Sequence, residues 1–133
     1  MKIHHVGIAS THLNTALESL MLAQSAIIEE VYDELQGNVL YFIQQTQETS
    51  IIELVIPFRS NSTVSNFTRK NGTALHHIGF STPSLKLSID KHKLLKGHFL
   101  LKEYEINVDC FGGRVKTAFI YANGMLIEYI ENV

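Results

Sequence analysis

The chain has 133 residues, of which 45% are hydrophobic and 18% are charged, and its net charge at pH 7 is −2. This length and composition are typical of one globular domain and exclude a disordered chain. The weak negative charge gives no reason to expect a nucleic acid or membrane partner, and no apolar run approaches the about 20 residues of a membrane-spanning helix. Because Cys110 is the single cysteine, an internal disulfide is excluded, and we expect a cytoplasmic protein.

The first half of the sequence predicts a strand, a helix and three further strands. An apolar strand spans residues 3–9, and apolar residues at helical spacing predict a helix over 12–23. Ser10 or Thr11 is suited to cap the start of that helix. Three strand-like runs separated by turn residues follow, at 26–33, 38–44 and 50–56, with the turns at 36–38 and 46–48.

The same order of elements returns in the second half. Residues 58–74 are polar and predict a linker that contains a short helix over 62–70, closed by Asn71-Gly72. A strand then spans 75–81, and Thr82-Pro83-Ser84 begins a second helix that reaches about residue 96. The remaining strands are expected at 99–108, 114–121 and 126–130.

Each half is therefore a βαβββ module that cannot bury its sheet alone. We predict an α+β fold in which two pseudo-symmetric modules form a curved, eight-stranded mixed sheet around a cleft. The chain is expected to be one domain over residues 1–133, with module 1 at about 1–58, a linker at 59–73 and module 2 at about 74–133.

Both modules carry a histidine and a glutamate at matching places. Their first strands read Ile3-His4-His5-Val6-Gly7-Ile8-Ala9 and Leu75-His76-His77-Ile78-Gly79-Phe80-Ser81. His5 precedes Glu53 by 48 positions, and His77 precedes Glu128 by 51. Two such modules folded face to face would bring two imidazoles and two carboxylates together.

Strand alternation separates the two histidines of each pair, because neighbouring residues on a strand point to opposite faces. His5 and His77 share their faces with small residues, which leave space for a ligand. His4 and His76 share theirs with bulky apolar residues. We therefore expect His5 and His77 to line a cavity, and His4 and His76 to pack on the other side.

Glu53 and Glu128 lie in the middle of apolar strands, where a carboxylate is costly unless a cation or hydrogen bonds satisfy it. Their repetition at equivalent positions, each matched by a histidine, favours a divalent metal site made by His5, Glu53, His77 and Glu128. Ligands of this kind suit Co²⁺, Ni²⁺, Mn²⁺ or Zn²⁺. Exposed or hydrogen-bonded glutamates without a metal are the alternative.

These motifs resemble the vicinal oxygen chelate superfamily of glyoxalases, bleomycin-resistance proteins and dioxygenases. The likeness covers essentially the whole chain and is greatest for the methylmalonyl-CoA epimerase family. Three features favour that family over glyoxalase I: the double histidine that opens the second module, Pro57 after the first glutamate strand, and Phe111-Gly112-Gly113-Arg114 before the penultimate strand. The resemblance implies the same four metal ligands, His5, Glu53, His77 and Glu128.

The resemblance also implies a reaction. An isomerase of this kind removes a proton next to the carbonyl of an acyl thioester, bound to CoA or a carrier protein, through a metal-stabilised enediolate. Glu128 is the expected base, and Glu53 is the second choice. Some epimerases carry a further catalytic glutamate where this chain has Leu40, which puts a two-glutamate mechanism in doubt. Related proteins often dimerise, so we expect a homodimer.

Three other functions stay open on the sequence. The first is a glyoxalase I-type lactoylglutathione lyase that acts on a hemithioacetal. The second is a non-catalytic protein of the bleomycin-resistance type that binds a metabolite or drug. The third is an extradiol dioxygenase, which needs two histidines and one carboxylate around iron and would leave Glu53 as an extra ligand.

Overall fold

Helices and strands follow one another in the order βαβββ in each half of the chain. The structure is a computed structural model that describes residues 2–44, 46 and 50–133; of the turn expected at 46–48, residues 47 and 48 lie outside this range. The elements are β1 (Lys2–Ala9), α1 (Leu13–Ser19), β2 (Ile27–Asp33), β3 (Asn38–Ile43), β4 (Ile51–Pro57), α2 (Ser65–Asn71), β5 (Ala74–Ser81), α3 (Leu85–Lys93), β6 (His98–Val108), β7 (Gly113–Ala122) and β8 (Met125–Asn132). Two short 3-10 helices, η1 (Gln24–Ala26) and η2 (Asp109–Phe111), precede β2 and β7.

The eight strands hydrogen-bond in the order β2-β3-β4-β1-β5-β8-β7-β6. β5 pairs with β8 in parallel, whereas β2–β3, β3–β4, β6–β7 and β7–β8 are antiparallel. The predicted α+β class, with its eight-stranded mixed sheet, is thereby confirmed.

Contacts within the chain define two units. The N-terminal unit is Val6–His76, and the C-terminal unit combines Met1–His5 with His77–Val133. The boundaries fall inside β1 and β5. The first residues of β1 belong to the C-terminal unit, and the first residues of β5 belong to the N-terminal unit. The expected modules and their linker at 59–73 stay a prediction.

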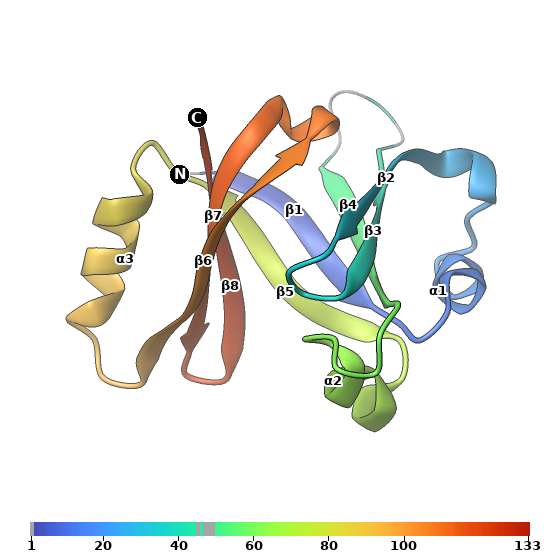
Figure 1. The fold of residues 1–133 in the computed structure, drawn as a ribbon, viewed down its shortest axis with the longest axis horizontal. Coiled ribbons are helices and arrows are strands. Elements are labelled where there is room, and N and C mark those ends of the chain that lie inside the picture. Colours follow the sequence, from blue (N-terminus) through green and yellow to red (C-terminus); the bar gives the residue numbers. More distant parts are fainter. Residues whose placement is uncertain (1, 45, 47–49) are drawn as a thin grey trace. The chain divides into compact units, whose positions relative to one another are not determined.

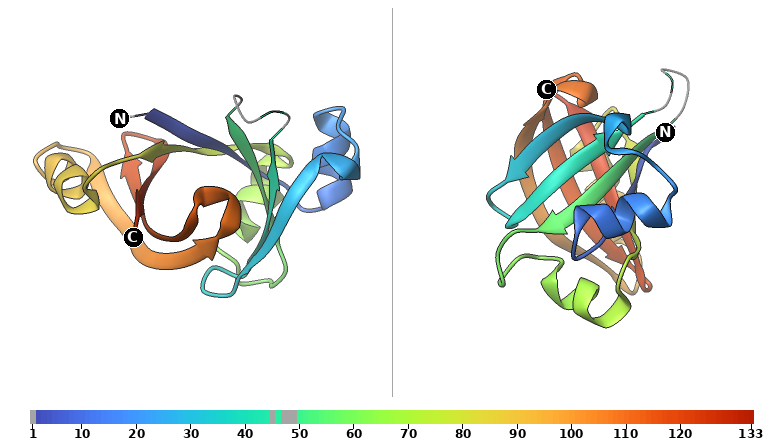
Figure 2. Two further views of the ribbon diagram at one scale, coloured as in Figure 1. Left: turned by 90° about the horizontal axis from the view of Figure 1, so that it is seen from above. Right: turned by 90° about the vertical axis from the view of Figure 1, so that its right-hand side faces the viewer.

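In the N-terminal unit, α1 packs on the sheet formed by β2, β3 and β4 (Figure 1). Its buried residues Ala16 and Leu17 contact Ile8, Ile43 and Leu54. The right-hand view of Figure 2 shows α1 in front of these strands. Apolar residues at helical spacing thus bury one side of the helix, as the sequence predicts.

In the C-terminal unit, α3 packs on β7 and β8 through Leu85 and Ile89, which contact Ile120 and Tyr129. β7 and β8 form a hairpin whose two-residue turn is Asn123-Gly124, with φ of 51° and 95°. Positive φ at both turn residues is typical of the tight hairpin turn that asparagine-glycine favours. This turn fixes the register of the hairpin and therefore the position of every side chain on β8.

Helix α1 is shorter than expected and ends at Ser19 rather than near residue 23. The backbone N–H of Met21 bonds to Glu18 O at 3.0 Å, and that of Leu22 bonds to Leu17 O at 2.9 Å. Met21 has a φ of 56°. These bonds and the left-handed residue form a Schellman motif, which stops the helix. No glycine marks this position, so the sequence gives little signal of the stop.

Helices α1 and α3 begin differently. Residue His12 caps α1 without a side-chain hydrogen bond, so the expected cap at Ser10 or Thr11 is wrong. Ser10 Oγ instead donates to His12 O at 3.1 Å. Ser84 caps α3, because its Oγ accepts from the backbone N–H of Leu87 at 3.2 Å. The start of the second helix is therefore close to the position predicted from 82–84.

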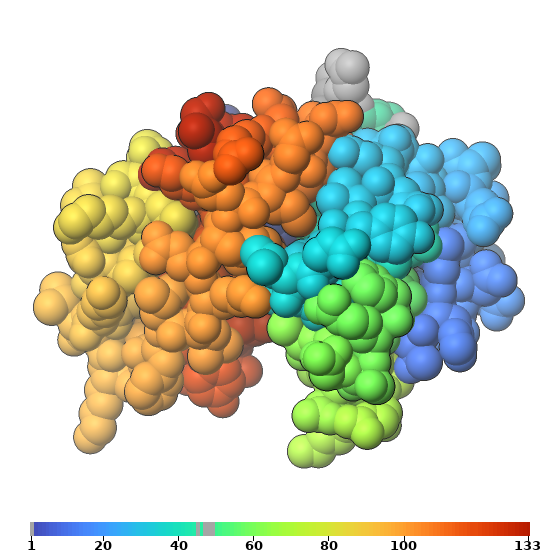
Figure 3. All heavy atoms as spheres, in the orientation of Figure 1, coloured from blue at the N-terminus to red at the C-terminus, as the bar shows by residue number. Residues whose placement is uncertain are grey.

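Large apolar side chains are exposed where α3 leads into β6, at Leu94, Leu95, Phe99 and Leu101. This segment lies on the yellow and orange surface in Figure 3. Such an area is suited to an interface, but the expected homodimer stays a prediction. Among the described residues, no helix has the length and apolar character that a bilayer crossing requires.

Candidate metal centre

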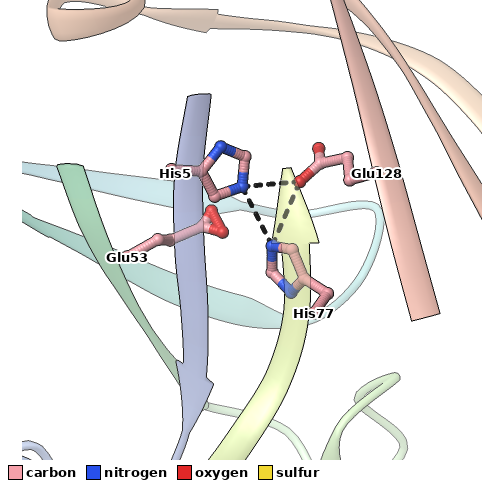
Figure 4. A group of neighbouring side chains, drawn as sticks. All are labelled: His5, Glu53, His77 and Glu128. Carbon is pink, nitrogen blue, oxygen red and sulfur yellow. Dashed lines mark hydrogen bonds and ion pairs between the residues drawn. The ribbon is translucent and has the colours of Figure 1, made fainter. Parts of the chain in front are cut away.

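Three of the four predicted ligands meet inside the C-terminal unit. His5 lies on β1, His77 on β5 and Glu128 on β8, and their side chains point toward one another (Figure 4). The two Nε2 atoms are 3.0 Å apart. Glu128 Oε1 is 2.9 Å from His5 Nε2 and 3.2 Å from His77 Nε2. None of the three residues is more than 4% exposed.

These spacings suit a bound cation. Ligand atoms about 2.1 Å from one ion, at right angles to each other, lie about 3.0 Å apart. The three distances between His5 Nε2, His77 Nε2 and Glu128 Oε1 are close to this value. Two neutral imidazoles and one carboxylate are also a donor set that first-row divalent metals accept. The residues present therefore fit a divalent ion.

Glu128 stays ionised in this buried place. Burial alone would raise the pKa of its carboxyl, but hydrogen bonds from His5 and His77 outweigh burial and hold that pKa well below its usual range. The second oxygen, Oε2, accepts a short hydrogen bond from Thr117 Oγ1. Thr117 is fully buried. The two carboxylate oxygens are thus distinguished by their partners, and Oε1 faces the histidines.

Glycine at position 79 makes room for the His5 ring. A Cβ atom built on Gly79 would lie 2.2 Å from His5 Cε1 and 2.4 Å from His5 Nδ1. Real Cβ atoms essentially never come so close to another heavy atom. The small residues beside His77 are expected to leave space for a ligand, and part of that space is filled by the imidazole of His5.

His5 also has neighbours on its other sides. Phe111 of η2 stacks on the His5 ring, with centroids 5.3 Å apart and an interplanar angle of 25°. His4 Nδ1 is 2.9 Å from His5 Nδ1. Burial, followed by the neighbouring His5, lowers the pKa of His4 to about 4 despite the opposite influence of Glu128. His4 is therefore neutral at neutral pH.

The expectation that His4 and His76 pack away from the site has two outcomes. For His76 it is supported, since its ring meets the edge of Phe67 on α2 with centroids 5.0 Å apart. For His4 it is wrong, because Nδ1 of His4 contacts Nδ1 of His5, one of the predicted ligands. Strand alternation sets the direction of Cβ only. Rotation about the bonds beyond Cα can still turn two neighbouring imidazoles toward each other.

The fourth predicted ligand, Glu53, belongs to the N-terminal unit. It lies on β4 opposite Phe42 of β3 and is 5% exposed. Its burial matches the expectation of a carboxylate set into an apolar strand. Leu40, where the sequence lacks an acidic residue, is 6% exposed on β3.

Two residues of this site escape prediction from the sequence, Thr117 and Phe111. The hairpin register puts Phe119 opposite Glu128, and Thr117 lies on the same face of β7 two residues before Phe119. The asparagine-glycine turn could have revealed that register, and with it the contact of Thr117 with Glu128. Phe111 comes from η2, and no pattern in the sequence places a loop side chain on the His5 ring.

No protein-family model and no curated protein matches the sequence. Solved structures do match. Methylmalonyl-CoA epimerase from Mycobacterium tuberculosis has a TM-score of 0.79 at 22% identity, over 99% of this chain and 88% of that one. A variant of the Streptomyces coelicolor epimerase, in complex with 2-nitronate-propionyl-CoA, has a TM-score of 0.77 at 24% identity, over 100% and 95%.

A third match is a hypothetical protein from Bacillus halodurans C-125, with a TM-score of 0.76 at 27% identity, over 99% of this chain and 94% of that one. All three likenesses extend over nearly the whole chain. The chain therefore has the fold of the methylmalonyl-CoA epimerases, which is that of the vicinal oxygen chelate superfamily.

Proposed function

We propose that the protein is a metal-dependent isomerase of the methylmalonyl-CoA epimerase type. The observation that carries this proposal is the buried trio of His5 Nε2, His77 Nε2 and Glu128 Oε1, all within 3.2 Å of one another. Buried ionisable groups at hydrogen-bonding distance are typical of functional sites. In this fold, the trio is best explained as one face of a metal site.

Glu53 is proposed as the fourth ligand. It is buried, like the other three residues, and offers a carboxylate oxygen. It holds the place in the first half that Glu128 holds in the second, in the last strand of a βαβββ unit. Two imidazoles and two carboxylates would balance the charge of a 2+ ion. Co²⁺, Ni²⁺, Mn²⁺ and Zn²⁺ all accept this set, so the metal content of the purified protein decides among them.

The proposed reaction is removal of a proton from the carbon next to a thioester carbonyl. A divalent ion bound here would supply a Lewis acid for the negative charge that develops on the substrate oxygen. Glu128 is the proposed base, since its carboxylate is ionised and Thr117 holds its second oxygen in a fixed orientation. Glu53 is the second choice. Leu40 cannot exchange a proton, and β3 (Asn38–Ile43) contains no carboxylate that could replace the further glutamate.

An acyl-CoA thioester is the proposed substrate. Two of the structures with this fold are epimerases in complex with 2-nitronate-propionyl-CoA and with methylmalonyl-CoA. Both ligands combine a short acyl group with CoA. A carrier-protein thioester presents the same carbonyl chemistry and is the alternative form of the substrate.

Deuterium exchange tests the proposal. The metal-loaded protein is incubated with methylmalonyl-CoA in D₂O, and incorporation of deuterium at the α-carbon is followed by mass spectrometry. We expect exchange that stops when the metal is chelated and in the Glu128→Gln variant, while the exposed-site variant His12→Gln exchanges as wild type. If the loaded protein instead converts the hemithioacetal of methylglyoxal and glutathione, it is a lyase. Metal binding without turnover of either compound would indicate a binding protein.

A further inference from the structure

His5 uses both of its ring nitrogens. Nε2 faces His77 and Glu128, at 3.0 and 2.9 Å. Nδ1 lies 2.9 Å from Nδ1 of His4. At that distance one of the two Nδ1 atoms carries a proton and donates a hydrogen bond to the other, because a neutral imidazole has one N–H and one bare nitrogen.

Binding of a cation decides which atom carries the proton. A nitrogen that binds a metal has no proton, so with Nε2 of His5 as ligand its single proton lies on Nδ1. The bare Nδ1 of His4, 2.9 Å away, can then accept a hydrogen bond from it. We infer that His4 is a positioning residue, whose Nδ1 accepts a hydrogen bond from the Nδ1–H of His5 and so fixes the tautomer and the ring angle in which His5 binds the metal. This inference rests on the proposed function.

The surroundings of His4 make it suited to this task. The edge of its ring meets Phe111 at a centroid distance of 4.4 Å and an interplanar angle of 87°. Phe111 also stacks on His5, so one aromatic ring holds both imidazoles. The Phe111 carbonyl accepts from Asn132 Nδ2 at 2.7 Å, which ties η2 to β8. His5 is thus restrained by Phe111, by Gly79 and by His4.

Partners that hydrogen-bond to a metal-binding histidine typically raise metal affinity by about 10- to 100-fold. Two substitutions separate the effect of the acceptor nitrogen of His4 from the effect of its aromatic ring. His4→Phe keeps an aromatic ring against Phe111 but has no acceptor. His4→Asn loses the ring but places a carbonyl oxygen, Oδ1, at the same number of bonds from the backbone as Nδ1.

Calorimetric titration of the metal-free protein with Zn²⁺ tests the inference. We expect His4→Phe to bind Zn²⁺ about 10- to 100-fold more weakly than wild type, and His4→Asn to recover most of the loss. His12→Gln, which changes an exposed histidine, is the matched control and should bind as wild type. Circular dichroism of each variant establishes that it is folded before titration.

A spectroscopic readout needs no variant. In ¹⁵N–¹H spectra of the zinc-loaded wild type, the His5 proton should appear on Nδ1 and should exchange slowly with solvent. Equal affinity of wild type and His4→Phe, a proton on Nε2 of His5, or a greater loss in His4→Asn than in His4→Phe would each overturn the role of His4. Failure of the wild type to bind Zn²⁺ at all would overturn the proposed metal site as well, so the two failures are distinguishable.

Discussion

Adding one methyl group at Gly79 should weaken the proposed metal centre. Three atoms of the His5 ring, Cε1, Nδ1 and Nε2, lie 2.2, 2.4 and 2.7 Å from the position of a Cβ at residue 79. His5 is fully buried, and Phe111 and His4 restrict its escape. In Gly79→Ala the imidazole or the backbone must therefore move. Overpacking of this kind costs about 1–3 kcal/mol of stability, and we also expect weaker Zn²⁺ binding.

The assay combines urea unfolding with Zn²⁺ titration, and a second substitution isolates the clash. In a His5→Ala background the ring is absent, so Gly79→Ala should cost close to nothing, and the coupling energy should approach the full cost of about 1–3 kcal/mol. Gly72→Ala is the control. Gly72 has a φ of 66° with no heavy atom near its Cβ position, so that variant should lose stability through backbone strain but keep its Zn²⁺ affinity. Wild-type stability and affinity in Gly79→Ala, or an equal cost in both backgrounds, would refute the reasoning.

Three further outcomes are expected. Thr117→Val, which keeps the shape but removes the hydroxyl that donates to Glu128, should lower the free energy of unfolding by about 1–3 kcal/mol in urea, and Thr117→Ser should restore it. Met21→Gly should raise the free energy of unfolding by about 0.5–1 kcal/mol. Glycine adopts the φ of 56° without strain, and this relief exceeds the greater chain entropy that glycine loses on folding. An equal gain from Met21→Ala would contradict this explanation. Burial, and then His98, lowers the pKa of His92 below 6.5, so protonation of His92 opposes folding. The contribution of neutral His92 to the free energy of unfolding is fully present above about pH 6.5 and falls as the pH drops below that value. His92→Gln should reduce this dependence in unfolding curves measured from pH 7 to pH 5.

The strands could be predicted from the sequence because their signals are local. Apolar runs bounded by turn residues indicate all eight strands, and Asn123-Gly124 marks a hairpin turn that the structure contains. The end of α1 could not be predicted, since a Schellman motif is expected at glycine and here uses Met21. The hydrogen bonds of this motif run from the backbone N–H groups of Met21 and Leu22 to carbonyls of the helix itself, so they form only once the helix exists.

The proposed ligands stand out in the sequence for a different reason. A carboxylate in an apolar strand is costly, so Glu128 stands out among its neighbours on residue type alone. Thr117 does not stand out, because a threonine is ordinary in a strand and its role depends on the register of β7 against β8. The rule of alternating faces places His4 on the wrong side, since it describes Cβ atoms and not the polar atoms at the tips of side chains.

The duplicated motif does not make His5 and His77 equivalent. His5 and His77 occupy matching positions on β1 and β5, and both contact Glu128 Oε1. Yet η2 belongs to the second half, and its Phe111 stacks on His5, whereas His77 meets Phe119 edge-on at 5.3 Å. Repetition of sequence therefore accounts for the matching positions of the two proposed ligands, while η2 gives His5 a stacked aromatic neighbour and His77 has an edge-on one. Substitutions around His5 should accordingly weaken metal binding through orientation of the ligand, without removing any ligand atom.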